Sequence, residues 1–153
     1  MPSQKLKNFL DENDIKYVSI KHSLAFTAVD IAKSAHIPSR EMAKTVIVKI
    51  DGKLCMVVVP ANYKVNLELL QQALGSTDIQ LAEEIEFFKA FPDCEVGAMP
   101  PFGNLYEMEV YVAESLTEDE KIAFNAGTHS EVMQMDYKDY EYLVKPKFII
   151  LSN

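Results

Sequence analysis

Lys44 is the residue whose type and position most strongly indicate chemistry in this 153-residue chain. Residues two apart in a strand share a face, so Lys44 lies on the apolar face that also carries Val46 and Val48. Burial disfavours an ammonium and lowers its pKa by up to roughly 3–5 units, which only a compensating contact or a function justifies. Lys44 is therefore either a functional lysine or a strand-end lysine whose head group reaches water.

A loop rich in proline and glycine is the second candidate. Residues 91–103 read Phe-Pro-Asp-Cys-Glu-Val-Gly-Ala-Met-Pro-Pro-Phe-Gly. Proline fixes φ, while Gly97 and Gly103 allow a ligand to approach the backbone closely. The segment is typical of a ligand cradle, and equally of a rigid connection.

The turn Gly127-Thr128-His129-Ser130 gathers hydroxyls and an imidazole at a predicted strand end, where hydrogen-bonding sites are common. The three histidines and two cysteines show no metal-ligand spacing, and no GxSxG, HExxH or GxGxxG motif is present. We therefore expect a site without metal or cofactor.

Helices and strands alternate along the chain and must position these residues. Periodicity and turn chemistry predict helices over 3–10, 28–35, 66–74, 83–90 and 136–143, and strands over 16–20, 45–50, 53–59, 107–113, 122–126, 131–135 and 147–151. Asp51-Gly52 predicts a type I′ hairpin, and the strand after it, apolar on both faces, predicts a central strand covered on both sides. Capping-box spacings begin at Thr27 and Thr117. We expect an α+β (mixed α/β) fold, one domain over 1–153, with a central mixed, largely antiparallel sheet flanked by helices.

Charge divides the chain unevenly. The formal net charge is −8, which argues against a nucleic-acid partner. Residues 1–64 nevertheless carry ten basic and six acidic residues (+4), and the remainder carries five and seventeen (−12). The split indicates either a dipolar surface whose N-terminal side meets phosphates, or scattered solvated charges. The longest apolar stretch, 54–60, is too short to span a membrane, and the unpaired cysteine pattern favours a cytoplasmic protein.

Taken in order, several motifs resemble the YbaK/EbsC family of aminoacyl-tRNA deacylases, which are free-standing relatives of the editing domain in bacterial prolyl-tRNA synthetase. The matching segments are His22, Thr27, Met42-Ala-Lys-Thr-Val-Ile-Val-Lys49, Val59-Pro-Ala61, Gly97-Ala-Met-Pro-Pro-Phe-Gly103 and Asn125-Ala-Gly-Thr-His129. They span nearly the whole chain, and their ordered set is more specific than any one of them.

The resemblance implies the roles of individual residues. Lys44 matches the family's essential lysine, and the loop from Gly97 matches the one whose backbone holds the ester and the attacking water, so these two are expected to be catalytic. The residues expected to bind substrate are His22, Phe26, Thr27, Met99, Pro100, Pro101, Phe102, Gly127, Thr128 and His129.

The resemblance also implies the reaction: trans-editing hydrolysis of mischarged tRNA carrying a small amino acid of the Ser, Thr, Ala or Cys class. The expected partners are aminoacyl-tRNA and an aminoacyl-tRNA synthetase, with no membrane and no metal. A protonated Lys44 would point at the ester carbonyl or the terminal phosphate, and one such donor accelerates a reaction by about 10²–10³-fold. Two alternatives stay open: a non-catalytic module binding aminoacyl-tRNA ends, oligonucleotides or a synthetase, and a hydrolase of another small activated ester or amide.

Overall fold

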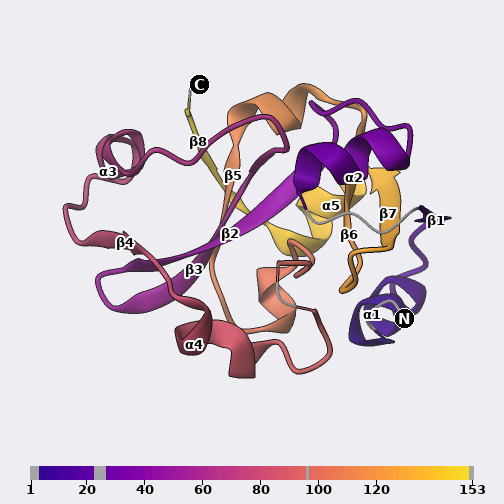
Figure 1. Ribbon diagram of the computed structural model, residues 1–153, viewed down its shortest axis with the longest axis horizontal. Helices are drawn as coiled ribbons and strands as arrows, with labels where there is room; N and C mark the ends of the chain where they lie inside the picture. The colour runs from indigo at the N-terminus through magenta and orange to yellow at the C-terminus, as the bar shows by residue number, and fades with distance from the viewer. Residues whose placement is uncertain (1–3, 23–26, 96, 152–153) are drawn as a thin grey trace.

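The computed structural model describes residues 4–22, 27–95 and 97–151 (Figure 1). The helices are α1 Gln4–Glu12, α2 Ala28–Ser34, α3 Leu67–Leu74, α4 Glu84–Phe87 and α5 Tyr137–Val144, with 3₁₀ turns η1 Phe88–Ala90, η2 Gly103–Leu105 and η3 Glu114–Glu118. The strands are β1 Tyr17–Lys21, β2 Ala43–Ile50, β3 Lys53–Pro60, β4 Ile79–Leu81, β5 Val110–Ala113, β6 Lys121–Asn125, β7 Glu131–Asp136 and β8 Lys147–Ile149.

The strands form two sheets. The larger sheet has the order β4-β2-β3-β5-β8, antiparallel around β2 and parallel from β3 to β8, and the smaller, β1-β7-β6, is antiparallel throughout. This confirms the α+β class and the largely antiparallel pairing, but the strands divide between two sheets instead of joining one. Two layers let each sheet bury an apolar face against the other.

The main core lies between the two sheets. Met56 and Val58 of β3 share one buried cluster with Phe124 of β6 and Met133 of β7. Because side chains alternate along a strand, Cys55, Val57 and Val59 of β3 lie on the opposite face of the sheet. The strand after the hairpin is therefore central and covered on both sides, as the sequence predicts.

Different helices cover the outer faces of the two sheets. Leu70 of α3 packs on the larger sheet, in the cluster that holds Val57 and Val59. Helix α2 packs on the smaller sheet, in a cluster that holds Ala123 of β6 and Val132 of β7 together with Met42 and Ala61. Strand β2 therefore begins next to the patch under α2 and runs beside the patch under α3.

Local signals fix most element ends. Asp51 and Gly52 have φ of 51° and 85°, both positive as a type I′ hairpin turn requires. The Thr27 hydroxyl accepts a hydrogen bond from the Asp30 N–H and caps α2, as the spacing predicts. Asn66 caps α3 in the same way, and Gly75 ends that helix in the left-handed conformation.

Three predictions of local structure are wrong or incomplete. Thr117 starts no helix, because its hydroxyl donates to the Glu114 carbonyl inside η3. Strand β5 begins at Val110 instead of residue 107, since Glu107 adopts a positive φ of 57° and interrupts the extended chain. The predicted helix over 83–90 divides into α4 and η1, and the short strand β4 was not predicted.

Within the described ranges, no helix combines the length and apolar character that crossing a bilayer requires.

Candidate functional site

Lys44 stands near the start of β2, on the outer face of the larger sheet. It pairs in register with Val59 of β3, which belongs to the patch under α3, and Met42 two residues earlier belongs to the patch under α2. Lys44 is half-buried there, as its parity with the apolar residues predicts. Burial lowers the pKa of its ammonium, and the positive charge of Lys64 lowers that pKa further.

Asn125 is a buried polar residue near the start of β2 to which the sequence assigned no role, although it begins one of the matching segments. An isolated parallel bridge joins Met42 to Ala123 of β6. Lys44 and Asn125 each lie two residues beyond this bridge, so we expect their side chains to lie on the same side of the two strands. Asn125 is only 7% exposed, and its Oδ1 has no hydrogen-bond partner within the described parts of the chain. Two facts in the sequence could have identified it: Asn125 shares parity with buried Ala123, and it ends an otherwise apolar strand.

The glycine-rich loop and the polar turn are held together by their backbones. The Glu95 N–H donates to the Gly127 carbonyl at 2.7 Å, and the Gly127 N–H donates to the Ala98 carbonyl at 3.0 Å. Gly97 between them has a φ of 84°, and a Cβ there would lie 3.3 Å from Cε1 of His129. A positive φ and the nearby His129 ring both favour glycine at this position.

The same turn also reaches the end of β1. The His22 N–H donates to the Ser130 carbonyl at 3.0 Å, and the Ser19 hydroxyl donates to the Glu131 carboxylate at 2.6 Å. The structure thus brings together three of the segments that the resemblance implied: His22, the loop at Gly97 and the turn at 127–129.

The buried side of the turn contains an unsatisfied hydroxyl. Thr128 is 4% exposed, and no partner for its Oγ1 exists in the portion of the chain that is described. Burying such an atom costs about 1–3 kcal/mol when nothing compensates it. Like Asn125 Oδ1, it marks a place where a substrate group could complete the hydrogen bonding.

Other predicted binding residues connect the glycine-rich loop to the hydrophobic core. Phe102 is fully buried and packs edge-on against Phe9, Phe124 and Tyr140. The Tyr140 hydroxyl donates to the Pro101 carbonyl at 2.7 Å. We expect these contacts, together with the burial of Met99 and Pro100, to fix the position of the loop.

Two predicted binding residues are not joined to this arrangement by any contact in the described chain. The Thr27 side chain is engaged in capping α2. Phe26 falls outside the described residues.

The site has the groups for electrostatic catalysis and lacks an activated thiol. Burial raises the pKa of Cys94 to about 12 and also raises that of Cys55, so both thiols stay protonated near neutral pH. Among the residues described, no three His, Cys, Asp or Glu side chains are grouped to hold a metal ion. What the site does offer is an ammonium, a rigid loop backbone, an imidazole and buried polar groups.

Comparisons with known proteins agree with this geometry. Residues 22–143 match the model of a family described as the aminoacyl-tRNA editing domain. The chain is 29% identical over 143 residues to the prolyl-tRNA editing protein ProX of Acetoanaerobium sticklandii, which covers 89% of this chain and 86% of that protein. A proline–tRNA ligase of Bacillus mycoides is 27% identical over 81 residues, 53% of this chain but only 14% of the ligase.

A solved structure of a candidate trans-editing enzyme for prolyl-tRNA synthetase has the same fold. It superposes with a TM-score of 0.83 at 16% identity and covers 99% of this chain and 96% of its own.

Proposed function

The chain belongs to the aminoacyl-tRNA editing domain family, and on that premise we propose that it removes small amino acids from mischarged tRNA in trans. Family membership makes it a hydrolase of the aminoacyl-tRNA ester bond. The observation that supports the proposal most directly is Lys44, a half-buried cation whose charged neighbour is a second cation, Lys64. Two ammonium groups that repel each other favour an anionic ligand between them.

The proposed reaction needs orientation more than a strong base, because an aminoacyl ester on a ribose hydroxyl is already activated. Water attacks the carbonyl carbon, negative charge develops on the carbonyl oxygen, and the C–O bond to the ribose breaks. The Lys44 ammonium donates to the developing oxyanion or to the terminal phosphate. One preorganised donor of this kind contributes about 10²–10³-fold in rate.

The loop at Gly97 supplies the backbone groups that hold the ester and the water. Its described residues are well anchored, because Glu95 and Ala98 are hydrogen-bonded to Gly127 and the chain after them rests on a buried aromatic cluster around Phe102. A rigid frame keeps reacting atoms near the productive geometry. We place the His129 ring at the same loop, where it limits the space available to the substrate.

We propose a small amino acid because the family resemblance implies one, and the buried polar atoms of the site fit a small polar substrate. Asn125 Oδ1 and Thr128 Oγ1 offer hydrogen bonds to a polar substrate group such as the α-ammonium. Pocket size alone discriminates one methylene by only about 1–3 kcal/mol, so we keep serine, threonine, alanine and cysteine as the proposed class.

The names of the relatives suggest which tRNA the chain meets. They are a prolyl-tRNA editing protein and proline–tRNA ligases, so we propose that the substrate is tRNA charged by a prolyl-tRNA synthetase, which would act as a partner. The first 64 residues, with a formal charge of +4, would face the tRNA, while the acidic remainder faces away.

A deacylation panel tests the proposal. Ser-, Thr-, Ala-, Cys- and Pro-charged tRNAs are given to the wild type and to Lys44→Ala, and release of free amino acid is followed over many turnovers. We expect hydrolysis of one or two species by the wild type and its loss in the variant. No turnover on any species would favour a binding module instead, and failure of uncharged tRNA to compete would favour another ester as substrate.

A further inference from the structure

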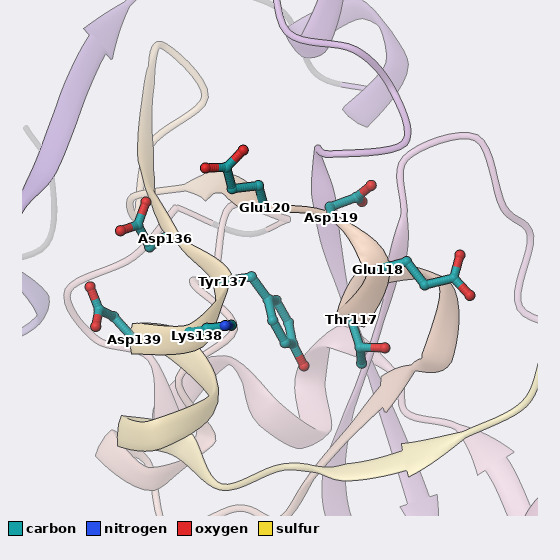
Figure 2. A pocket seen from close by; sticks show the side chains of 8 residues that line it. All are labelled: Thr117, Glu118, Asp119, Glu120, Asp136, Tyr137, Lys138 and Asp139. Atoms are coloured by element: carbon teal, nitrogen blue, oxygen red, sulfur yellow. The ribbon is translucent and has the colours of Figure 1, made fainter.

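An acidic groove lies at the end of the β6–β7 hairpin remote from the turn at 127–130 (Figure 2). One wall is the segment 117–120, from the end of η3 to the start of β6, and the other is the segment 136–139 at the start of α5. Its volume is about 540 Å³, within the range of roughly 300–1,000 Å³ found for ligand sites.

Carboxylates dominate the lining of this groove. Five of its eight residues are acidic, and they come from both walls: Glu118, Asp119, Glu120, Asp136 and Asp139. Lys138 is the one basic residue of the lining, and Lys121 pairs with Asp136 at 2.7 Å beside it. Negative charge therefore exceeds positive charge, and the field in the groove repels phosphates and attracts cations.

A second observation indicates that a ligand completes the groove. Tyr137 is only 3% exposed, and its hydroxyl has no hydrogen-bond partner anywhere in the described ranges. Figure 2 shows its ring crossing from the α5 wall toward Thr117. Native structures rarely leave a buried hydroxyl unsatisfied, since doing so costs about 1–3 kcal/mol.

Asp119 on the facing wall also has an unsatisfied polar atom. Its carboxylate oxygen Oδ2 is buried without a hydrogen-bond partner in the described chain. Burial raises the pKa of this carboxyl, and nearby Glu41 raises it further, although Arg40 acts in the opposite direction. A cationic donor in the groove would supply a hydrogen bond to Oδ2 and offset the excess negative charge.

We propose that this groove is a docking site for a lysine- or arginine-bearing segment of a partner protein. A guanidinium or ammonium can donate to the Asp119 carboxylate and to the Tyr137 oxygen. A metal ion fits less well, because the described residues offer no metal-binding group. An occupant here leaves the far end of the hairpin, and with it the editing site, open to tRNA.

A peptide titration of the whole ¹⁵N-labelled protein tests this proposal. The probe is an alternating lysine–alanine peptide, used at physiological ionic strength, where charges separated by more than about 8 Å are screened. We expect shift changes concentrated at 117–120 and 136–139, and none with an alternating glutamate–alanine peptide. Changes spread over the other acidic surfaces would overturn the proposal, as would spermidine binding as tightly as the peptide.

Variants make the test specific to the groove. Glu118→Gln with Glu120→Gln changes two exposed residues, and we expect it to weaken peptide binding about tenfold. The matched control, Glu12→Gln with Glu84→Gln, removes the same charge from exposed sites elsewhere and should change binding less than about twofold. Equal weakening by both pairs would refute the proposal.

Tyr137→Phe removes only the unpartnered hydroxyl. We expect it to keep or raise the melting temperature and to weaken peptide binding severalfold; unchanged binding would count against the site. Deacylation of charged tRNA should be unaffected by these groove variants, so failure here is distinguishable from failure of the proposed editing function.

Discussion

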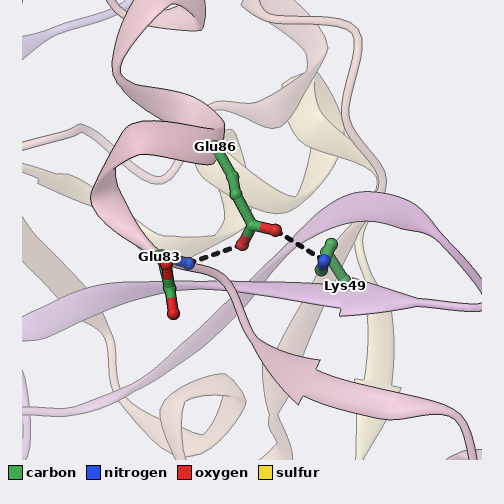
Figure 3. A network of polar contacts seen from close by, with 3 residues as sticks. All are labelled: Lys49, Glu83 and Glu86. Carbon is green, nitrogen blue, oxygen red and sulfur yellow. Dashed lines mark hydrogen bonds and ion pairs between the residues drawn. The ribbon is translucent and has the colours of Figure 1, made fainter.

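Lys44 and Lys49 lie near opposite ends of strand β2. They differ in the sheet face they occupy, in their charged neighbours and in the direction of their pKa shifts. Lys49 points to the other face of the sheet, where its Nζ lies 2.5 Å from Glu86 Oε1, and the second oxygen of Glu86 accepts from the Glu83 N–H (Figure 3). The hydrogen bond from Lys49 to Glu86 raises the pKa of Lys49, whereas burial and the charge of Lys64 lower the pKa of Lys44.

We propose that this difference separates a structural lysine from a functional one. Lys49 is paired with a carboxylate that is itself fixed by a capping box, so its contacts are complete without a ligand. Lys44 is partly desolvated, with a cation as its charged neighbour, an arrangement that costs stability and that an anionic ligand would relieve. Perturbed groups of this second kind cluster at functional sites.

The largest expected effect separates the two lysines directly. Lys44→Ala should lower kcat for deacylation by about 10²–10³-fold, because it removes the proposed oxyanion donor. Lys49→Ala, the matched control on the same strand, should keep nearly the wild-type rate. Single-turnover assays on mischarged tRNA measure both. A wild-type kcat in Lys44→Ala would show that Lys44 is not the donor, and a rise in KM alone would assign it to the phosphate.

A smaller loss is expected from Gly97→Ala. The added Cβ would enter contact with His129 at 3.3 Å at a positive φ, so the loop must shift, and a shift of about 1 Å can cost up to 10²-fold in rate. Gly52→Ala is the control, because Gly52 also has a positive φ of 85° but nothing within 4 Å of its Cβ. Both variants should lose stability, and only Gly97→Ala should lose activity; equal activity in the two would argue against a role for the loop.

Asn125→Leu should have an intermediate effect on activity and little effect on stability. The substitution removes the acceptor proposed to bind substrate, and we expect kcat/KM to fall about tenfold, in line with the 1–3 kcal/mol value of a buried polar contact. Because Oδ1 has no partner in the described chain, the free protein should lose little when it is removed. Exposed Asn104→Leu is the control, and melting temperatures with kcat/KM measure both.

The sequence predicted on which face Lys44 lies but assigned no role to Asn125, and the reason is physical. Strand parity is local, so alternation in 44–50 places Lys44 on the apolar outer face without knowledge of the fold. The position of Asn125 relative to Lys44 depends on an isolated bridge between Met42 and Ala123, residues far apart in the chain. No local pattern encodes that pairing.

The same distinction holds for the elements. The Asp51-Gly52 hairpin and the caps at Thr27 and Asn66 follow from adjacent residues and were predictable. Short β4 has no pattern of its own and exists because it pairs with β2. The division into two sheets likewise arises from long-range packing.

The smallest expected effect is the pH dependence of stability, and it compares Lys44 with Lys49 in the protein without substrate. A lowered folded-state pKa means that the folded protein binds fewer protons than the unfolded chain, so the cost of Lys44 is present at neutral pH and is lost as the pH rises from its folded-state pKa to its ordinary value. The raised pKa of Lys49 gives the opposite sign: its contribution is complete below the ordinary lysine pKa and is lost as the pH rises through the folded value.

Lys44→Met should therefore raise the melting temperature at neutral pH, and Lys49→Met should lower it. The two differences from wild type should both shrink as the pH becomes alkaline, from opposite sides. Thermal unfolding of the three proteins across the alkaline range measures this. Differences of the same sign would show that Lys44 is satisfied within the protein, and the contrast between the two ends of β2 would then not explain the site.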